Sequence, residues 1–151
     1  MPTGLMDRLP PPGLTPRKLV QRVGDDIGVD LLRSWCVDLL RGEASAEDDR
    51  YPHIGWLGGT TGWLAYWARV WGARGLLHAG PPDDPAPVLA GLEDEAWRVR
   101  EMVLKVITRY ELDDPAGRIA GLTQDPVGRV RWQAWRALGV PPFARATRGH
   151  G

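Results

Sequence analysis

The stretches DEAWRVREMVLKVI at residues 94–107 and DPVGRVRWQAWRAL at residues 125–138 decide the fold. In each stretch apolar or small residues recur at three- and four-residue steps, which is the pattern of an amphipathic helix. The second stretch begins 31 residues after the first, so the chain repeats one helical element at a fixed distance. One helix pair cannot cover its own apolar face, and stacking of successive pairs is the physical reason for such a period.

The same register extends back to residue 61. Two columns of the three units are basic, namely Arg69, Arg100 and Arg131, and Arg74, Lys105 and Arg136. Four columns are apolar or small, namely Ala68, Val99 and Val130; Gly72, Val103 and Ala134; Gly75, Val106 and Ala137; and Leu76, Ile107 and Leu138. Trp63 stands where the later units have Asp94 and Asp125. We therefore expect the first unit to be a degenerate or capping repeat.

Periodicity and turn-forming residues divide the rest of the chain. Three Asp-Pro dipeptides place an acid that can cap a helix before a proline that suits its first position, at Asp84-Pro85, Asp114-Pro115 and Asp125-Pro126. We predict helices near residues 17–24, 27–41, 61–78, 85–93, 96–110, 114–123 and 127–138, and no strands. We expect disordered tails at residues 1–15 and 139–151, a helical cap with an acidic loop over 16–60, and the repeats over 61–138.

The two quoted stretches resemble HEAT repeats, in which an Asp is followed after four residues by Val-Arg, and the short period is similar to the lyase-type subclass of that family. The resemblance covers residues 61–138, about half of the chain. It implies an all-α fold, a short right-handed α-solenoid of about three helix pairs with an N-terminal helical cap. It also implies that Asp94 with Arg100 and Asp125 with Arg131 form a structural ladder between neighbouring repeats.

Composition limits the classes of function. The 151 residues suit one domain, and 19 basic and 19 acidic residues leave no net attraction to nucleic acid or to an anionic membrane. Cys36 is the only cysteine, which excludes an intrachain disulfide and fits a reducing compartment. No stretch is apolar enough to cross a membrane, so we expect a cytoplasmic protein without a membrane partner. His53, His78 and His150 lack metal-ligand spacing, so we expect no metal, no cofactor and no catalytic residues.

Aromatic and basic residues beside the core columns form the candidate contact surface. On one long helix the indoles would follow a single stripe that a basic residue continues, at Trp63, Trp67, Trp71 and Arg74. The later repeats carry basic residues in the same columns, at Arg98, Lys105, Arg129 and Arg136. Tryptophan and arginine are common in binding hot spots. Two structural alternatives stay open: the N-terminal helices cover the indoles, and the basic residues form an ordinary solvated face.

These patterns favour a non-enzymatic module that binds another protein through the concave helix surface. A competing interpretation is a nucleic-acid-binding protein whose basic concave track contacts phosphates, and residues 115–151, with six arginines and one acid, fit that interpretation. The resemblance also raises a chromophore-lyase-like enzyme, although fold alone does not give function. Asp48, Asp49, Tyr51 and His53 in the acidic loop are the candidates for acid-base chemistry.

Overall fold

The computed structural model describes residues 4–139, and in this range the chain is all-helical, without strands. This confirms the expected all-α class. The α-helices are α1 (Pro16–Ile27), α2 (Val29–Leu40), α3 (Tyr66–Ala79), α4 (Ala86–Ala90), α5 (Trp97–Tyr110), α6 (Arg118–Leu122) and α7 (Gly128–Ala137). The 3-10 helices are η1 (Gly4–Asp7), η2 (Ile54–Leu57) and η3 (Gly91–Glu93). The tail expected at residues 139–151 lies, apart from residue 139, outside the described residues.

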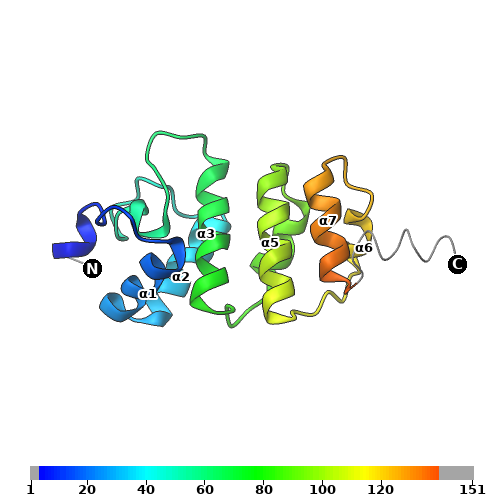
Figure 1. The fold of residues 1–151 in the computed structure, drawn as a ribbon, viewed down its shortest axis with the longest axis horizontal. Helices are drawn as coiled ribbons and strands as arrows, with labels where there is room; N and C mark the ends of the chain where they lie inside the picture. The colour runs from blue at the N-terminus through cyan, green and yellow to red at the C-terminus, as the bar shows by residue number, and fades with distance from the viewer. Residues whose placement is uncertain (1–3, 140–151) are drawn as a thin grey trace, which may run out of the picture.

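Helices α3, α5 and α7 stand side by side in chain order (Figure 1). The short helices α4 and η3 pack beside α5, and α6 packs beside α7. At the other end, α1 and α2 pack on α3. Each of the three long helices therefore has a preceding helix or helices beside it, and successive long helices contact one another directly.

Helix α2 makes its most extensive contacts with α3. Two small residues of α3 allow this close approach, because a Cβ atom on Gly72 would lie 2.6 Å from the carbonyl oxygen of Cys36, and one on Gly75 would meet the Cys36 sulfur. Within the single domain, the expected division between a cap over 16–60 and the repeats over 61–138 thus separates two helices that are tightly packed together. Helix α2 belongs with α3 and is more than a cap.

Bidentate ion pairs join each long helix to the loop that precedes the next long helix. Nε and Nη2 of Arg69 donate to the carboxylate of Asp94 at 2.8 and 3.1 Å, and the same atoms of Arg100 donate to Asp125 at 2.8 and 3.2 Å. Each Asp also accepts a backbone N–H two residues later, from Ala96 or Val127. The ladder therefore runs from the Arg of one unit to the Asp of the next.

Within a unit, the arginine bonds to the backbone of its own Asp. Nη1 of Arg100 donates to the carbonyl of Asp94 at 2.8 Å, and Nη1 of Arg131 donates to that of Asp125 at 2.7 Å. The pairs implied by the resemblance, Asp94 with Arg100 and Asp125 with Arg131, are thus contacts inside a unit. Between units the carboxylates pair with Arg69 and Arg100, so Arg69 is a member of the ladder that the implied pairs left out.

Two predicted helices begin later than expected. Residues 61–65 form a turn with Gly62 at a positive φ of 82°, and α3 begins only at Tyr66, so Trp63 precedes the helix. Asp114 does not start a helix directly, because Gly117 adopts a left-handed conformation and α6 begins at Arg118. The carboxylate of Asp114 still accepts the backbone N–H of Ile119, at 2.8 Å. The acid caps the helix from a longer loop than the dipeptide suggested.

The N-terminal segment packs against the loop that follows α2, and the prediction of a disordered tail is wrong for residues 4–15. The Met6 side chain is buried, and its carbonyl accepts the N–H of His53 at 2.9 Å. The indole N–H of Trp56 donates to the carbonyl of Arg8 at 2.7 Å. Composition did not reveal this order because the apolar surface is supplied by another segment, with Ile54, Trp56 and Leu57 buried in η2.

Replacement of Arg100 by Leu should destabilise the fold strongly. The Asp125 side chain is 3% exposed, so loss of its partner leaves a buried carboxylate without compensation, at a cost of about 3 kcal/mol. Chemical denaturation measures the change in the free energy of unfolding. Arg131→Leu is the matched control, since it removes only the bond to the Asp125 carbonyl and should cost about 1 kcal/mol or less. Equal losses in the two variants would contradict the role assigned to the ion pair.

Candidate interaction surface

Aromatic rings and guanidinium groups stack at the edge of the fold where α3, α5 and α7 begin. Trp63 and Trp67 meet edge to face with ring centroids 5.3 Å apart, and Tyr66 stacks on Trp67, also at 5.3 Å. The Arg98 guanidinium lies 5.2 Å from the ring centroid of Trp67 and 4.3 Å from that of Trp97. The Arg129 guanidinium also lies near Trp97, 5.2 Å from the ring centroid. We call Trp63, Tyr66, Trp67, Trp97, Arg98 and Arg129 the aromatic–arginine cluster.

The repeat register brings this cluster together. Trp67, Arg98 and Arg129 occupy one column at 31-residue steps, so neighbouring helices present them side by side. Tyr66 and Trp97 occupy the adjacent column, which places an aromatic ring next to each arginine. The sequence pattern correctly grouped the first column. Trp97 was not among the candidate residues, although its 31-residue spacing from Tyr66 was a usable signal.

A buried acid fixes the outer end of the cluster. The Glu101 carboxylate accepts from Nε and Nη2 of Arg129 at 2.8 and 3.1 Å. The Glu101 side chain is 8% exposed, whereas that of Arg129 is 63% exposed. The pair therefore orients a mostly exposed guanidinium on α7 from a carboxylate on α5. Glu101 was not predicted as a site residue, and its position within an apolar helix face was the only sequence signal.

Trp71 and Arg74 do not belong to the exposed surface. Trp71 is 3% exposed and packs against Trp67 and the loop residue Gly59, so its prediction as a partner contact is wrong. Arg74 donates from Nη2 to the carbonyl of Leu57 at 3.0 Å, and burial lowers its pKa. The expected cover from the N-terminal part of the chain thus exists over Trp71 but not over Trp63, which is 57% exposed. It comes from the loop that follows η2, at Gly59.

The other two predicted basic residues lie away from the cluster. Lys105 is half-buried on α5, and Arg136 is exposed on α7, where its guanidinium lies 5.1 Å from the ring of Trp132. Beside Arg98 the surface is hollowed, with a volume of about 310 Å³ between Tyr66, Ala96 and Trp97. The predicted basic track therefore divides into the cluster and a separate Arg136 site.

Three of the four candidates for acid-base chemistry form contacts that hold the loop, and the fourth, Asp49, is exposed. Tyr51 donates its hydroxyl to Asp38, and burial together with this bond raises the Tyr51 pKa to about 12. Asp48 forms an ion pair with Arg50 at 2.6 Å, and Nδ1 of His53 accepts the N–H of Gly55 at 2.9 Å. Across residues 4–139 no group of three or more His, Cys, Asp or Glu side chains is arranged to hold a metal ion. In the same range, no helix combines the length and the apolar character that a membrane span needs.

Acidification should destabilise the fold through His78. Burial lowers the His78 pKa below its ordinary value of 6.5, and the nearby cations Arg109, Arg74 and Arg17 lower it further. The unfolded chain therefore binds a proton more readily, so stability is complete above pH 6.5 and is lost as the pH falls through the folded pKa. Thermal melts between about pH 8 and pH 5 should show a smaller decrease in Tm for His78→Gln than for the parent chain. Identical slopes would contradict this assignment.

Comparison with known proteins assigns the chain to no family. No protein-family model, no curated protein and no solved structure matches it significantly.

Proposed function

We propose that the chain is a non-enzymatic protein-interaction module, built as a short right-handed α-solenoid of HEAT-like helix pairs. Two observations support this architecture. The long helices follow one another in chain order, and the same bidentate ion pair recurs in the same register at Arg69 with Asp94 and at Arg100 with Asp125. Stacked helix pairs expose a long surface for their size, which is the usual reason for such folds to serve as binding modules. A cytoplasmic location is part of this proposal.

The aromatic–arginine cluster is the observation that carries the binding function. Monomeric proteins rarely leave large aromatic side chains exposed together, and such groups are typical of contact sites. Trp63 is 57% exposed, and the neighbouring rings hold it at a defined angle. Ring stacking restricts these side chains before binding, so less conformational entropy is lost when a partner docks.

Arg98 gives this surface its preference for a partner. Its guanidinium lies between the rings of Trp67 and Trp97, and in the described part of the chain no carboxylate pairs with it. A guanidinium stacked by its face keeps its N–H edges available as donors. We therefore expect the partner to offer a carboxylate beside an apolar or aromatic side chain.

A nucleic-acid partner is the competing proposal. Arg136 is exposed over Trp132, and an arginine beside an exposed ring is a feature of proteins that bind single strands. The charge of Arg129, however, is matched by Glu101, and Arg74 is held inside the fold. Fewer arginines of the predicted track are thus available for phosphates than the sequence suggested. This favours the protein partner.

Affinity capture with the full chain, followed by a binding titration with the purified partner, tests the proposal. The double variant Trp67→Ala with Arg98→Ala should weaken binding about thirtyfold, which corresponds to a hot-spot loss of about 2 kcal/mol. Trp63→Ala, which removes the most exposed aromatic side chain of the cluster, should weaken binding without a change in Tm. The matched control, Trp132→Ala with Arg136→Ala, removes the same kinds of side chain from α7 and should leave the affinity unchanged.

Two results would count against the proposal. Equal loss of affinity in the cluster variant and in the α7 control would show that the cluster is not the contact surface. A gel-shift titration at low salt, where release of counterions favours association most, separates the competing function. Binding of single-stranded or duplex DNA that is lost in the Arg98 and Arg136 variants, without a captured protein, would replace the protein partner by nucleic acid.

A further inference from the structure

The repeat register identifies an unused rung of the ion-pair ladder on α7. Arg69, Arg100 and Arg131 occupy one column, and the first two donate from Nε and Nη2 to an Asp of the next unit. For Arg131 the corresponding Asp would lie one repeat further on. Among residues 4–139 no carboxylate fills that place.

Arg131 is already oriented to receive such a carboxylate. Its Nη1 donates to the Asp125 carbonyl at 2.7 Å, just as Nη1 of Arg100 donates to the Asp94 carbonyl at 2.8 Å. In Arg100 this bond leaves Nε and Nη2 directed at the next Asp. The guanidinium of Arg131 is held in the same manner, so its two remaining donors can form a bidentate pair without reorganisation.

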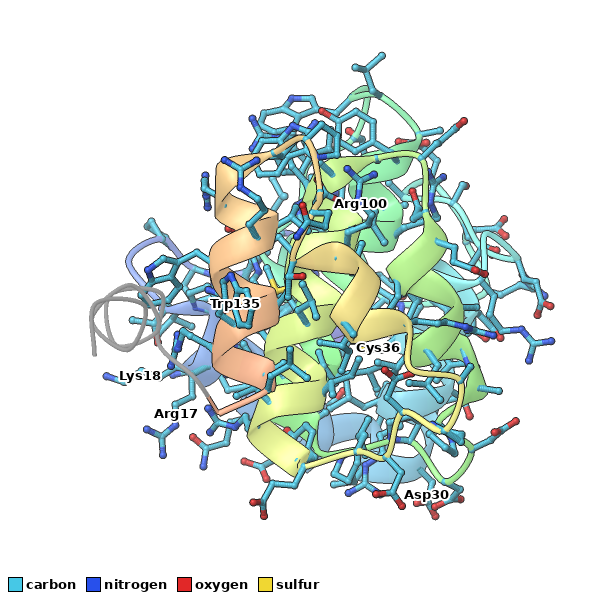
Figure 2. All side chains as sticks on the ribbon, turned by 90° about the vertical axis from the view of Figure 1, so that its right-hand side faces the viewer. Arg17, Lys18, Asp30, Cys36, Arg100 and Trp135 are labelled. Atoms are coloured by element: carbon cyan, nitrogen blue, oxygen red, sulfur yellow. The ribbon has the colours of Figure 1, made fainter. Side chains whose placement is uncertain are left out.

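The residue next to Arg131 also lacks the cover that its counterparts in the earlier repeats have. Val70 and Glu101, in the column next to the ladder, are 5% and 6% exposed because the following helix covers them. The third member of this column is Trp132, which is 47% exposed. Figure 2 looks onto this end of the molecule, where α7 lies in front and carries the labelled Trp135. Helix α7 thus presents the face that α3 and α5 bury against their successors.

We propose that this face of α7 binds a helix of another protein that begins at an Asp. The carboxylate of that Asp would pair with Nε and Nη2 of Arg131, and apolar side chains of the helix would cover Trp132. The charge of the surface is complementary, because residues 126–139 contain three arginines and no acid. This site is separate from the aromatic–arginine cluster and goes beyond the function proposed above.

The segment that follows α7 in the sequence cannot supply this carboxylate. Residues 140–151 contain neither Asp nor Glu. A second copy stacked head to tail would place Trp63 at the rung, since Trp63 stands 31 residues before Asp94. Helices α1 and α2 also pack on α3 and occupy the side on which such a copy would dock. These two facts favour a different protein over self-association.

A labelled peptide with the sequence of residues 112–138 is a suitable probe, because it contains α7, an Asp-led helix that docks on α5 within the chain. The probe carries Arg129→Leu for one reason. In the docked peptide this arginine would face Trp132 of the chain, which stands where Glu101 stands one repeat earlier and cannot pair with it. Fluorescence anisotropy with the full chain should show binding. Asp125→Asn in the probe, or Arg131→Gln in the chain, should each weaken it about tenfold, and the two together no more than either alone.

The controls separate this proposal from the function proposed above. Arg22→Gln in the full chain removes an exposed arginine of α1, outside the ladder, and should leave the affinity unchanged. Trp67→Ala with Arg98→Ala should also leave it unchanged, whichever way the partner capture turns out. Absence of binding up to millimolar peptide would overturn the proposal. So would binding that does not distinguish Asp from Asn, or that is lost with the cluster variant.

Discussion

The ion pair between Arg100 and Asp125 is the constraint on which the order of the repeats depends. It joins two groups that are nearly inaccessible to water, with side-chain exposures of 13% and 3%, so neither tolerates the loss of the other. Buried ion pairs add little net stability compared with apolar packing, but they penalise every alternative arrangement that leaves a charge unpaired. The pair therefore acts on specificity: it fixes which turn of α5 faces the start of α7.

The aromatic–arginine cluster is a consequence of that register. Arg98 meets the rings of Trp67 and Trp97 only if α3 and α5 align at the same step that brings Arg69 to Asp94. A shift by one residue would move each side chain by about 100° around its helix and separate the cations from the rings. The aromatic–arginine cluster and the ion-pair ladder thus depend on the same alignment of α3 with α5. A substitution that disrupts the ladder should therefore also disturb the cluster.

Periodicity predicted the C-terminal half of the fold well, because the contacts there join neighbouring repeats at positions set by the repeat length. The helix α5 and the column of Trp67, Arg98 and Arg129 both follow from a 31-residue step, whereas the sequence left the exposure of Trp63 open. Cover of the indoles by the N-terminal helices stayed an open alternative, but the part of the cover that a loop supplies over Trp71 could not be predicted, because the composition of that loop is that of a solvated turn although Ile54 and Trp56 are buried in it. The order of residues 4–15 was missed for the same reason, since Met6 contacts residues far away in the chain.

The close approach of α2 and α3 has a chemical consequence for the only thiol of the chain. Cys36 is fully buried against Gly75, and burial raises its pKa to about 12, so almost none of it is thiolate at neutral pH. An alkylating reagent can reach the sulfur only when the two helices separate, and it then needs the thiolate to react. The rate at which Cys36 is modified in the native protein therefore reports how often the first helix pair opens. A cysteine introduced on the outer surface can be labelled selectively, because Cys36 does not react on the timescale of the labelling reaction.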